Sequence, residues 1–158
     1  MCKKKIAVIG VGNILMGDEG VGVEVVRRLE RLKYLGDVEL IDAGTAFLDV
    51  VLELRSFEKV IIIDAVHGGE AAGTVYRFTL DDVEGDKPAI SLHDFGVIES
   101  IRLERLVAEL PKEIVFYGVE PQIINLAMQL SPTVGEKVDY VIQKIIDELI
   151  ASGVQVQR

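Results

Sequence analysis

Short apolar runs alternate along the chain with longer segments whose apolar residues recur at helical spacing. The runs at 6–9, 38–41, 60–63 and 114–117 are short and rich in β-branched or aromatic residues, which predicts strands rather than helices. The run at 60–63 is apolar at every position, as expected for a central strand covered on both faces. Strands that alternate with helices in this way predict an α/β fold built on a mostly parallel sheet.

Helical spacing occurs in four segments between or after these strands. Each has apolar residues three or four positions apart, so one side is expected to face the core. The residues expected to point inward are Val25, Val26, Leu29 and Leu32 in the first helix, Leu48, Val51 and Leu52 within 47–54, Leu103, Leu106, Val107 and Leu110 in the third, and Val134, Val138, Val141, Ile145 and Leu149 in the last, which we expect 133–136 to cap.

Residues 74–80 alternate between polar and apolar side chains, which is typical of a strand with one exposed face. No helical segment separates them from the strand at 60–63, so we expect an edge strand that runs antiparallel. The predicted fold is one three-layer α/β/α domain over residues 1–158 with a mixed, mostly parallel sheet of about five strands.

The loop after the first strand places two carboxylates, Asp18 and Glu19, at the strand's carboxyl end, where open α/β sheets bind ligands. A dinucleotide site is the first alternative. The dinucleotide-binding fingerprint needs a third glycine at the position of Leu15. It also needs an acidic residue about 20 positions after the fingerprint, whereas Asp42 lies roughly 30 positions after Gly10. Pyrophosphate would also be repelled by two carboxylates, so the loop favours a cation.

Three further candidates follow strands or begin a helix. Asp64 directly follows the run at 60–63, and Asp42 follows 38–41, where it either caps its own loop or helps to orient a ligand. His93 falls in a predicted first helical turn that Ser91 and Asp94 cap, where the helix dipole favours the neutral imidazole that a metal ligand requires.

Six different short motifs follow one another over nearly the whole chain. They are Gly10-x-Gly12-Asn13-x-Leu15-x-x-Asp18-Glu19-Gly20-x-Gly22, Asp42-x-Gly44-Thr45, Asp64-Ala65, Ser91-Leu92-His93-Asp94-x-Gly96, Gly118-Val119-Glu120-Pro121 and Leu130-Ser131-Pro132-Thr133-Val134. Together they resemble the motifs of the hydrogenase maturation endopeptidases, which trim a C-terminal extension from the large subunit of nickel-iron hydrogenases. His67 lies outside these motifs, in a glycine-rich loop, and is expected to be a surface residue.

The resemblance implies a phosphorylase/hydrolase-like fold and an endopeptidase whose partner is the immature hydrogenase large subunit. It further implies that Glu19, Asp64 and His93 are the catalytic and metal-binding residues, with Asp42 as an accessory substrate-binding residue. The metal would be nickel that the precursor already carries, so the isolated protein is expected to hold metal weakly. Two alternatives stay open: a nucleotide-binding Rossmann-like module or oxidoreductase, and a metal-dependent peptidase that acts on another precursor.

Composition and the absence of certain motifs argue against several other classes of protein. The net charge of −9 argues against a nucleic-acid partner, because phosphates require a basic surface. The sequence has no Gly-x-Ser-x-Gly, no Walker loop, no Cys-x-x-Cys and no His-Glu-x-x-His. No apolar run is long enough for membrane insertion. The single cysteine, Cys2, fits a reducing compartment, so we expect a cytoplasmic protein.

Overall fold

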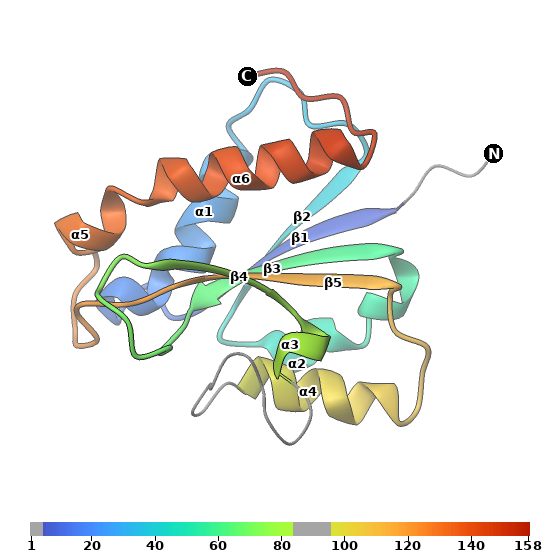
Figure 1. The fold of residues 1–158 in the computed structure, drawn as a ribbon, viewed down its shortest axis with the longest axis horizontal. Coiled ribbons are helices and arrows are strands. Elements are labelled where there is room, and N and C mark those ends of the chain that lie inside the picture. Colours follow the sequence, from blue (N-terminus) through green and yellow to red (C-terminus); the bar gives the residue numbers. More distant parts are fainter. Residues whose placement is uncertain (1–4, 84–95) are drawn as a thin grey trace.

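The computed structural model describes residues 5–83 and 96–158. Figure 1 shows the arrangement of the elements. They are β1 (Ile6–Val11), η1 (Gly17–Gly20), α1 (Val21–Leu29), β2 (Val38–Gly44), α2 (Phe47–Val51), η2 (Leu54–Ser56), β3 (Lys59–Ala65), β4 (Val75–Thr79), α3 (Leu80–Val83), α4 (Gly96–Arg105), β5 (Glu113–Val119), α5 (Pro132–Gly135) and α6 (Val138–Ala151), where η denotes a 3-10 helix.

One five-stranded sheet, in the order β2-β1-β3-β5-β4, organises the chain. The four strands β2, β1, β3 and β5 run parallel, and β4 pairs antiparallel with β5 at the edge. The predicted mixed sheet with an antiparallel edge strand is therefore confirmed. Strands β1 and β3 are neighbours in the middle of the sheet, so the residues that follow them meet at one rim.

Helices cover both faces of the sheet, with α1, α5 and α6 on one side and α2, α3 and α4 on the other (Figure 1). Alternate residues of each central strand serve the two layers: Ile61 and Ile63 pack with α1 and α6, whereas Val60 and Ile62 pack with α2 and α4. Both faces are buried, which explains why the run at 60–63 is apolar throughout. The three-layer prediction is confirmed.

The expected inward face of α4 is wrong, and that of α2 is right only in part. In α4 the buried residues are Val97, Ile98 and Ile101, whereas Leu103 is 64% and Leu106 80% exposed. The helix ends at Arg105, so Leu106 lies beyond it, and the apolar spacing that faces the sheet starts earlier in the chain. Because one residue is a rotation of about 100° on a helix, a small error of phase turns the predicted face outward.

In α2 the prediction is confirmed for Val51, which is buried, but Leu48 is 66% and Leu52 56% exposed, and Phe47 is buried in their place. In the last helical segment the predicted face is confirmed, since Val138 and Leu149 have no exposed surface. The segment expected to cap this helix instead forms a separate short helix, α5, and α6 itself begins after Lys137 without a side-chain cap. Ser131 caps α5: its hydroxyl oxygen accepts a hydrogen bond of 3.3 Å from the Val134 N–H. Within the two described ranges, every helix is too short or too polar to cross a bilayer.

Helix α1 lies unusually close to the two central strands, because Gly22 faces them. A Cβ on Gly22 would lie 2.1 Å from the carbonyl oxygen of Ile63 and 2.6 Å from that of Val11. On the opposing strand, a Cβ on Gly10 would lie 2.3 Å from the Gly22 carbonyl oxygen. This contact seats the start of α1, and with it the preceding turn η1, directly on the carboxyl end of β1.

We therefore expect Gly22→Ala to lower the free energy of unfolding by about 3 kcal/mol, since backbone atoms cannot move aside for a methyl group. Chemical denaturation of the purified variant measures the loss. Gly135→Ala is the matched control, because a Cβ there would meet only the Leu130 Cβ, at 4.0 Å. A Gly22 variant as stable as the Gly135 variant would contradict the close packing of α1.

Candidate functional site

A cleft of about 730 Å³ opens at the carboxyl ends of β1 and β3, and Glu19 and Asp64 both line it. Glu19 comes from η1, and Asp64 is the last residue but one of β3. Other walls come from the ends of β1 and β2, the start of α2, His67, Ile124 and the first turn of α4. The predicted meeting of Glu19 and Asp64 at one rim is thus what the structure shows.

The two carboxylates influence each other electrostatically. Burial raises the pKa of Asp64 well above its ordinary value of 3.8, a hydrogen bond from the Ala65 N–H opposes this, and the negative charge of Glu19 raises the pKa further. The Ala65 N–H donates to Asp64 Oδ1 at 2.8 Å. No lysine or arginine is among the described residues that line the cleft. A cation would relieve this repulsion, so the donor set fits a metal ion.

Gly12 allows the two acidic residues to approach. Its φ of 135° is a conformation that side chains disfavour, and a Cβ there would lie 1.8 Å from the Glu19 carbonyl oxygen. The same Cβ would lie 3.6 Å from Asp64 Oδ1. Any larger residue at position 12 would therefore push the Glu19 turn away from the end of β3.

Asp18, the neighbour of Glu19, is fully buried and has a structural role. Its carboxylate accepts hydrogen bonds from the N–H groups of Gln122, Ile123 and Ser131 at 2.7 to 2.8 Å, and from the Ser131 hydroxyl at 2.8 Å. Burial alone would raise the pKa of Asp18, but these hydrogen bonds outweigh it and lower the pKa. Asp18 thereby fixes η1 against the 121–131 segment.

His93 lies outside the described residues, so its predicted place beside Glu19 and Asp64 stays a prediction. Within residues 5–83 and 96–158, no three histidine, cysteine or acidic side chains are arranged to hold a metal ion. Glu19 and Asp64 alone therefore supply at most two ligands of the predicted three. The first described turn of α4, Gly96, Val97 and Ser100, does line the cleft, only three residues after His93 in the sequence.

Asp42 lies at the same rim but not among the residues that line the cleft. Its Oδ1 accepts a hydrogen bond of 3.0 Å from the Gly44 N–H, and its Oδ2 lies 3.7 Å from Arg27 Nε. Gly44 and Thr45 do line the cleft. Asp42 thus shapes the loop that forms this wall, and its accessory role toward a substrate stays a prediction.

His67 is exposed, as expected, but it also lines the cleft, which the sequence reasoning missed. Its loop is fastened by Glu120, a buried carboxylate that accepts hydrogen bonds from the Gly68 N–H at 2.7 Å and the Gly69 N–H at 3.2 Å. The Tyr76 hydroxyl donates to the same group at 3.1 Å. Two signals were available: His67 follows Asp64 by three residues, and Glu120 belongs to one of the motifs.

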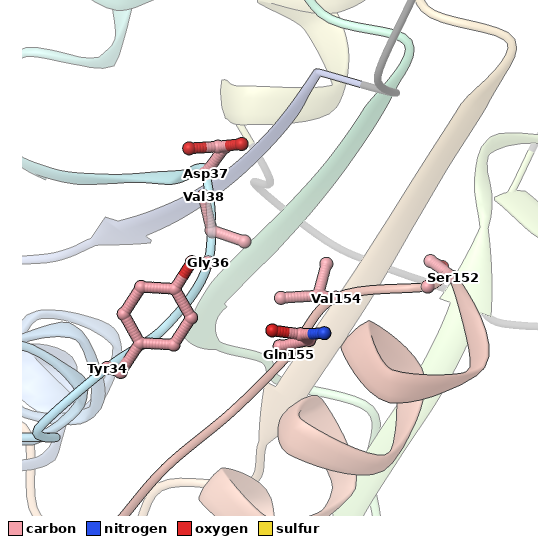
Figure 2. Close-up of a pocket in the computed structure, with 8 residues that line it drawn as sticks. Tyr34, Gly36, Asp37, Val38, Ser152, Val154 and Gln155 are labelled. Carbon is pink, nitrogen blue, oxygen red and sulfur yellow. The ribbon is translucent and has the colours of Figure 1, made fainter. Parts of the chain in front are cut away.

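A second hollow, of about 350 Å³, lies where β2 begins, at the opposite end of the sheet (Figure 2). Val154 and Gln155 of the C-terminal segment line it together with Tyr34 and Val38, and Tyr34 and Gln157 form an antiparallel bridge. Asp37 is the one carboxylate among its lining residues, and no histidine is among them. This hollow lacks the paired acidic groups of the cleft.

Residues 23–148 match the family model described as hydrogenase maturation protease. The chain is also 33% identical, over 96% of its length and 94% of the relative's, to the hydrogenase 2 maturation protease of Escherichia coli (strain K12). The chain belongs to the hydrogenase maturation protease family. Its members are endopeptidases, so the dinucleotide-binding alternative is not supported.

Solved structures of such maturation proteases share this fold. The hydrogenase maturating endopeptidase HybD from E. coli superposes with a TM-score of 0.84 at 31% identity and covers 98% of each chain. The [NiFe] hydrogenase maturation protease HycI from Thermococcus kodakarensis KOD1 superposes with a TM-score of 0.71 at 25% identity and covers 93% of each. The family predicted from the motifs is therefore confirmed over almost the whole chain.

For this maturation protease we expect Asp18→Asn to lower the free energy of unfolding by about 3 kcal/mol at pH 7, because an amide NH2 would face the buried N–H donors. Since the folded pKa of Asp18 is lowered from 3.8, the stabilisation is full above that value and disappears as pH falls through the folded pKa. Urea unfolding at several pH values measures this. Asp49→Asn, which replaces an exposed carboxylate, is the control. An equal loss of stability in both variants would contradict the role of the Asp18 hydrogen bonds, which we call the Asp18 clamp.

Asp64→Asn is expected to do the opposite and raise the free energy of unfolding at pH 7, by about 1 kcal/mol. The folded pKa of Asp64 is raised, so its contribution to stability is present below 3.8 and is lost as pH rises through the folded pKa. Asparagine cannot ionise and keeps the Oδ1 acceptor for the Ala65 N–H. Urea unfolding should show a gain that shrinks toward acid pH, and a loss at pH 7 would contradict the repulsion.

Proposed function

We propose that this maturation protease removes the C-terminal extension of a nickel-loaded [NiFe] hydrogenase large-subunit precursor in the cytoplasm. The pairing of Glu19 and Asp64 in an open cleft is the observation that supports the proposal most. A cleft of about 730 Å³ has room for a segment of an extended peptide, and both carboxylates are among the residues that would contact it. Such a cleft suits a peptide that reaches the site together with a cation.

Nickel in this proposal is part of the substrate. Glu19 and Asp64 would offer it oxygen ligands and His93 a ring nitrogen, a mixed set that suits a borderline divalent ion. The mutual repulsion of Glu19 and Asp64 favours binding of a cation, while three ligands leave much of its coordination sphere to other groups. The precursor would fill that remainder, so its nickel identifies it as correctly loaded and ready for cleavage.

Peptide hydrolysis at this cleft would use the open positions of the metal. A bound divalent ion can polarise a scissile carbonyl or activate a water molecule, and both actions place the reaction beside Asp64. Among the cleft residues that the structure describes, the geometry does not favour a serine acyl-enzyme. Ser100 lines the cleft, but its hydroxyl donates to the Gly96 carbonyl of its own helix at 2.8 Å instead of to a base.

The deciding experiment incubates the purified protein with precursor before and after nickel loading and measures the released C-terminal peptide. We expect release only from the loaded precursor. Glu19→Gln, Asp64→Asn and His93→Ala should each lower the rate at least a hundredfold, the order seen when a group that stabilises the transition state is removed. Asp49→Asn, an exposed carboxylate on α2, is the matched control and should process normally.

The result separates the proposal from its alternatives. Equal cleavage of nickel-free precursor would overturn recognition through nickel, and normal activity of His93→Ala would remove the metal site from the mechanism. If the purified protein cleaves neither the nickel-loaded nor the nickel-free precursor, the result would favour a peptidase that acts on another precursor. Asp42→Asn tests the accessory residue in the same assay: asparagine keeps the acceptor for the Gly44 N–H but removes the charge, so an unchanged rate would leave Asp42 a structural role only.

A further inference from the structure

Three large apolar side chains stand out into solvent beside the cleft. Leu15 is 50% exposed, Leu126 86% and Met128 81%. Leu15 belongs to the loop after β1, whereas Leu126 and Met128 belong to the 121–131 segment. Large apolar side chains exposed as a group mark interaction surfaces more often than single ones do. We call this group the apolar ledge.

The ledge is carried by two segments that a single parallel bridge joins into a short ribbon. Met16 and Ala127 pair in this bridge, in which the Gly17 N–H donates to the Ala127 carbonyl at 2.8 Å and the Ala127 N–H to the Leu15 carbonyl at 3.1 Å. Leu15 precedes Met16, and Leu126 and Met128 flank Ala127. The three ledge side chains are exposed, whereas Met16 and Ala127 between them are half-buried.

This ribbon is held rigidly. The Asp18 N–H donates to the Ile123 carbonyl at 2.9 Å, and the buried Asp18 carboxylate accepts from the Gln122 and Ile123 N–H groups. The three ledge side chains therefore project from a fixed backbone. A rigid surface loses little conformational entropy when a partner binds, which favours affinity.

The ledge also continues into the cleft. Ile124 lines the cleft, is 39% exposed, and precedes Leu126 by two residues. The whole 121–131 segment contains no charged residue, although the chain carries a net charge of −9. The cores of protein interfaces are depleted in charge and enriched in methionine and aromatic residues. On the other side of the ledge, Met128 lines a hollow together with the charged residues Glu24, Arg27 and Arg28. An uncharged segment between the acidic cleft and a charged rim has the composition of a docking site for a protein.

We propose that the apolar ledge docks the folded body of the precursor through an uncharged apolar surface next to its cleavage site. The C-terminal segment of the same precursor then enters the cleft. This inference rests on the proposed function. A second copy of this chain is the less suitable occupant, because a copy seated beside Ile124 would obstruct the cleft that the segment must enter.

The test compares processing of nickel-loaded precursor by the wild-type protein and by Leu126→Gln/Met128→Gln. Glutamine has nearly the volume of either residue but resists desolvation, so KM should rise at least tenfold while kcat stays within twofold. Leu15→Gln, from the other loop, should raise KM in the same way. Because all three side chains are exposed, the midpoints of thermal unfolding should match wild type, which excludes misfolding as the cause.

The matched control is Leu103→Gln/Leu106→Gln. These leucines are 64% and 80% exposed. Leu103 lies near the end of α4 and Leu106 just beyond it, away from the first turn that lines the cleft, so their replacement should leave KM unchanged. If wild type processes the precursor and the ledge variants keep its KM, the docking inference is overturned and the proposed function stands. If wild type does not process it, both are overturned. A dimer in sedimentation that the ledge substitutions dissociate, with KM unchanged, would assign the ledge to a second copy.

Discussion

The buried carboxylate of Asp18 is the interaction on which the site depends. It joins two loops that are more than 100 residues apart in the sequence, since all four of its hydrogen-bond donors lie between residues 122 and 131. A buried charge is costly unless it is fully hydrogen-bonded, and here the donors more than compensate, because the pKa of Asp18 is lowered despite its burial. The adjacent residue, Glu19, inherits this fixed position and faces the cleft.

The cleft brings two negatively charged side chains, Glu19 and Asp64, close together. Asp64 ends the most apolar strand, so burial raises its pKa and the charge of Glu19 raises it further. Packing elsewhere offsets the cost: Gly10 and Gly22 bring α1 against the strands, and the two hydrophobic layers cover both sheet faces. A stable framework can thus hold two carboxylates close together in an arrangement that by itself lowers stability.

The sequence was sufficient for the features that depend on local pattern. Strand positions, the parallel sheet with its antiparallel edge, and the meeting of Glu19 and Asp64 at one rim follow from apolar runs and from the rule that such strands share a carboxyl end. The inward face of α4 and part of that of α2 did not follow, because apolar residues occur on more than one side of these helices, so spacing alone leaves their phase open.

Contacts between distant segments were beyond sequence reasoning. Nothing local shows that Asp18 would bind Ser131 or that Glu120 would fasten the loop of His67, because hydrogen bonds of this kind depend on which loops the fold brings together. The sequence places Asp18 only beside Glu19, as the second carboxylate at the carboxyl end of the first strand. Asp18 and Glu19 are adjacent in the tight turn η1, so their side chains can point in different directions. Asp18 is buried and stabilises the fold, whereas Glu19 faces the cleft.

The clamp at Asp18 also sets a distance. It fixes Glu19 on one side and the backbone that carries Leu126 and Met128 on the other, so the separation between the acidic pair and the apolar ledge belongs to the fold. For a substrate protein bound to the ledge, the distance from the docking surface to the cleft would then be fixed. Selection of one peptide bond in a folded substrate would then follow from geometry, with little need for the cleft to read the side chains around that bond.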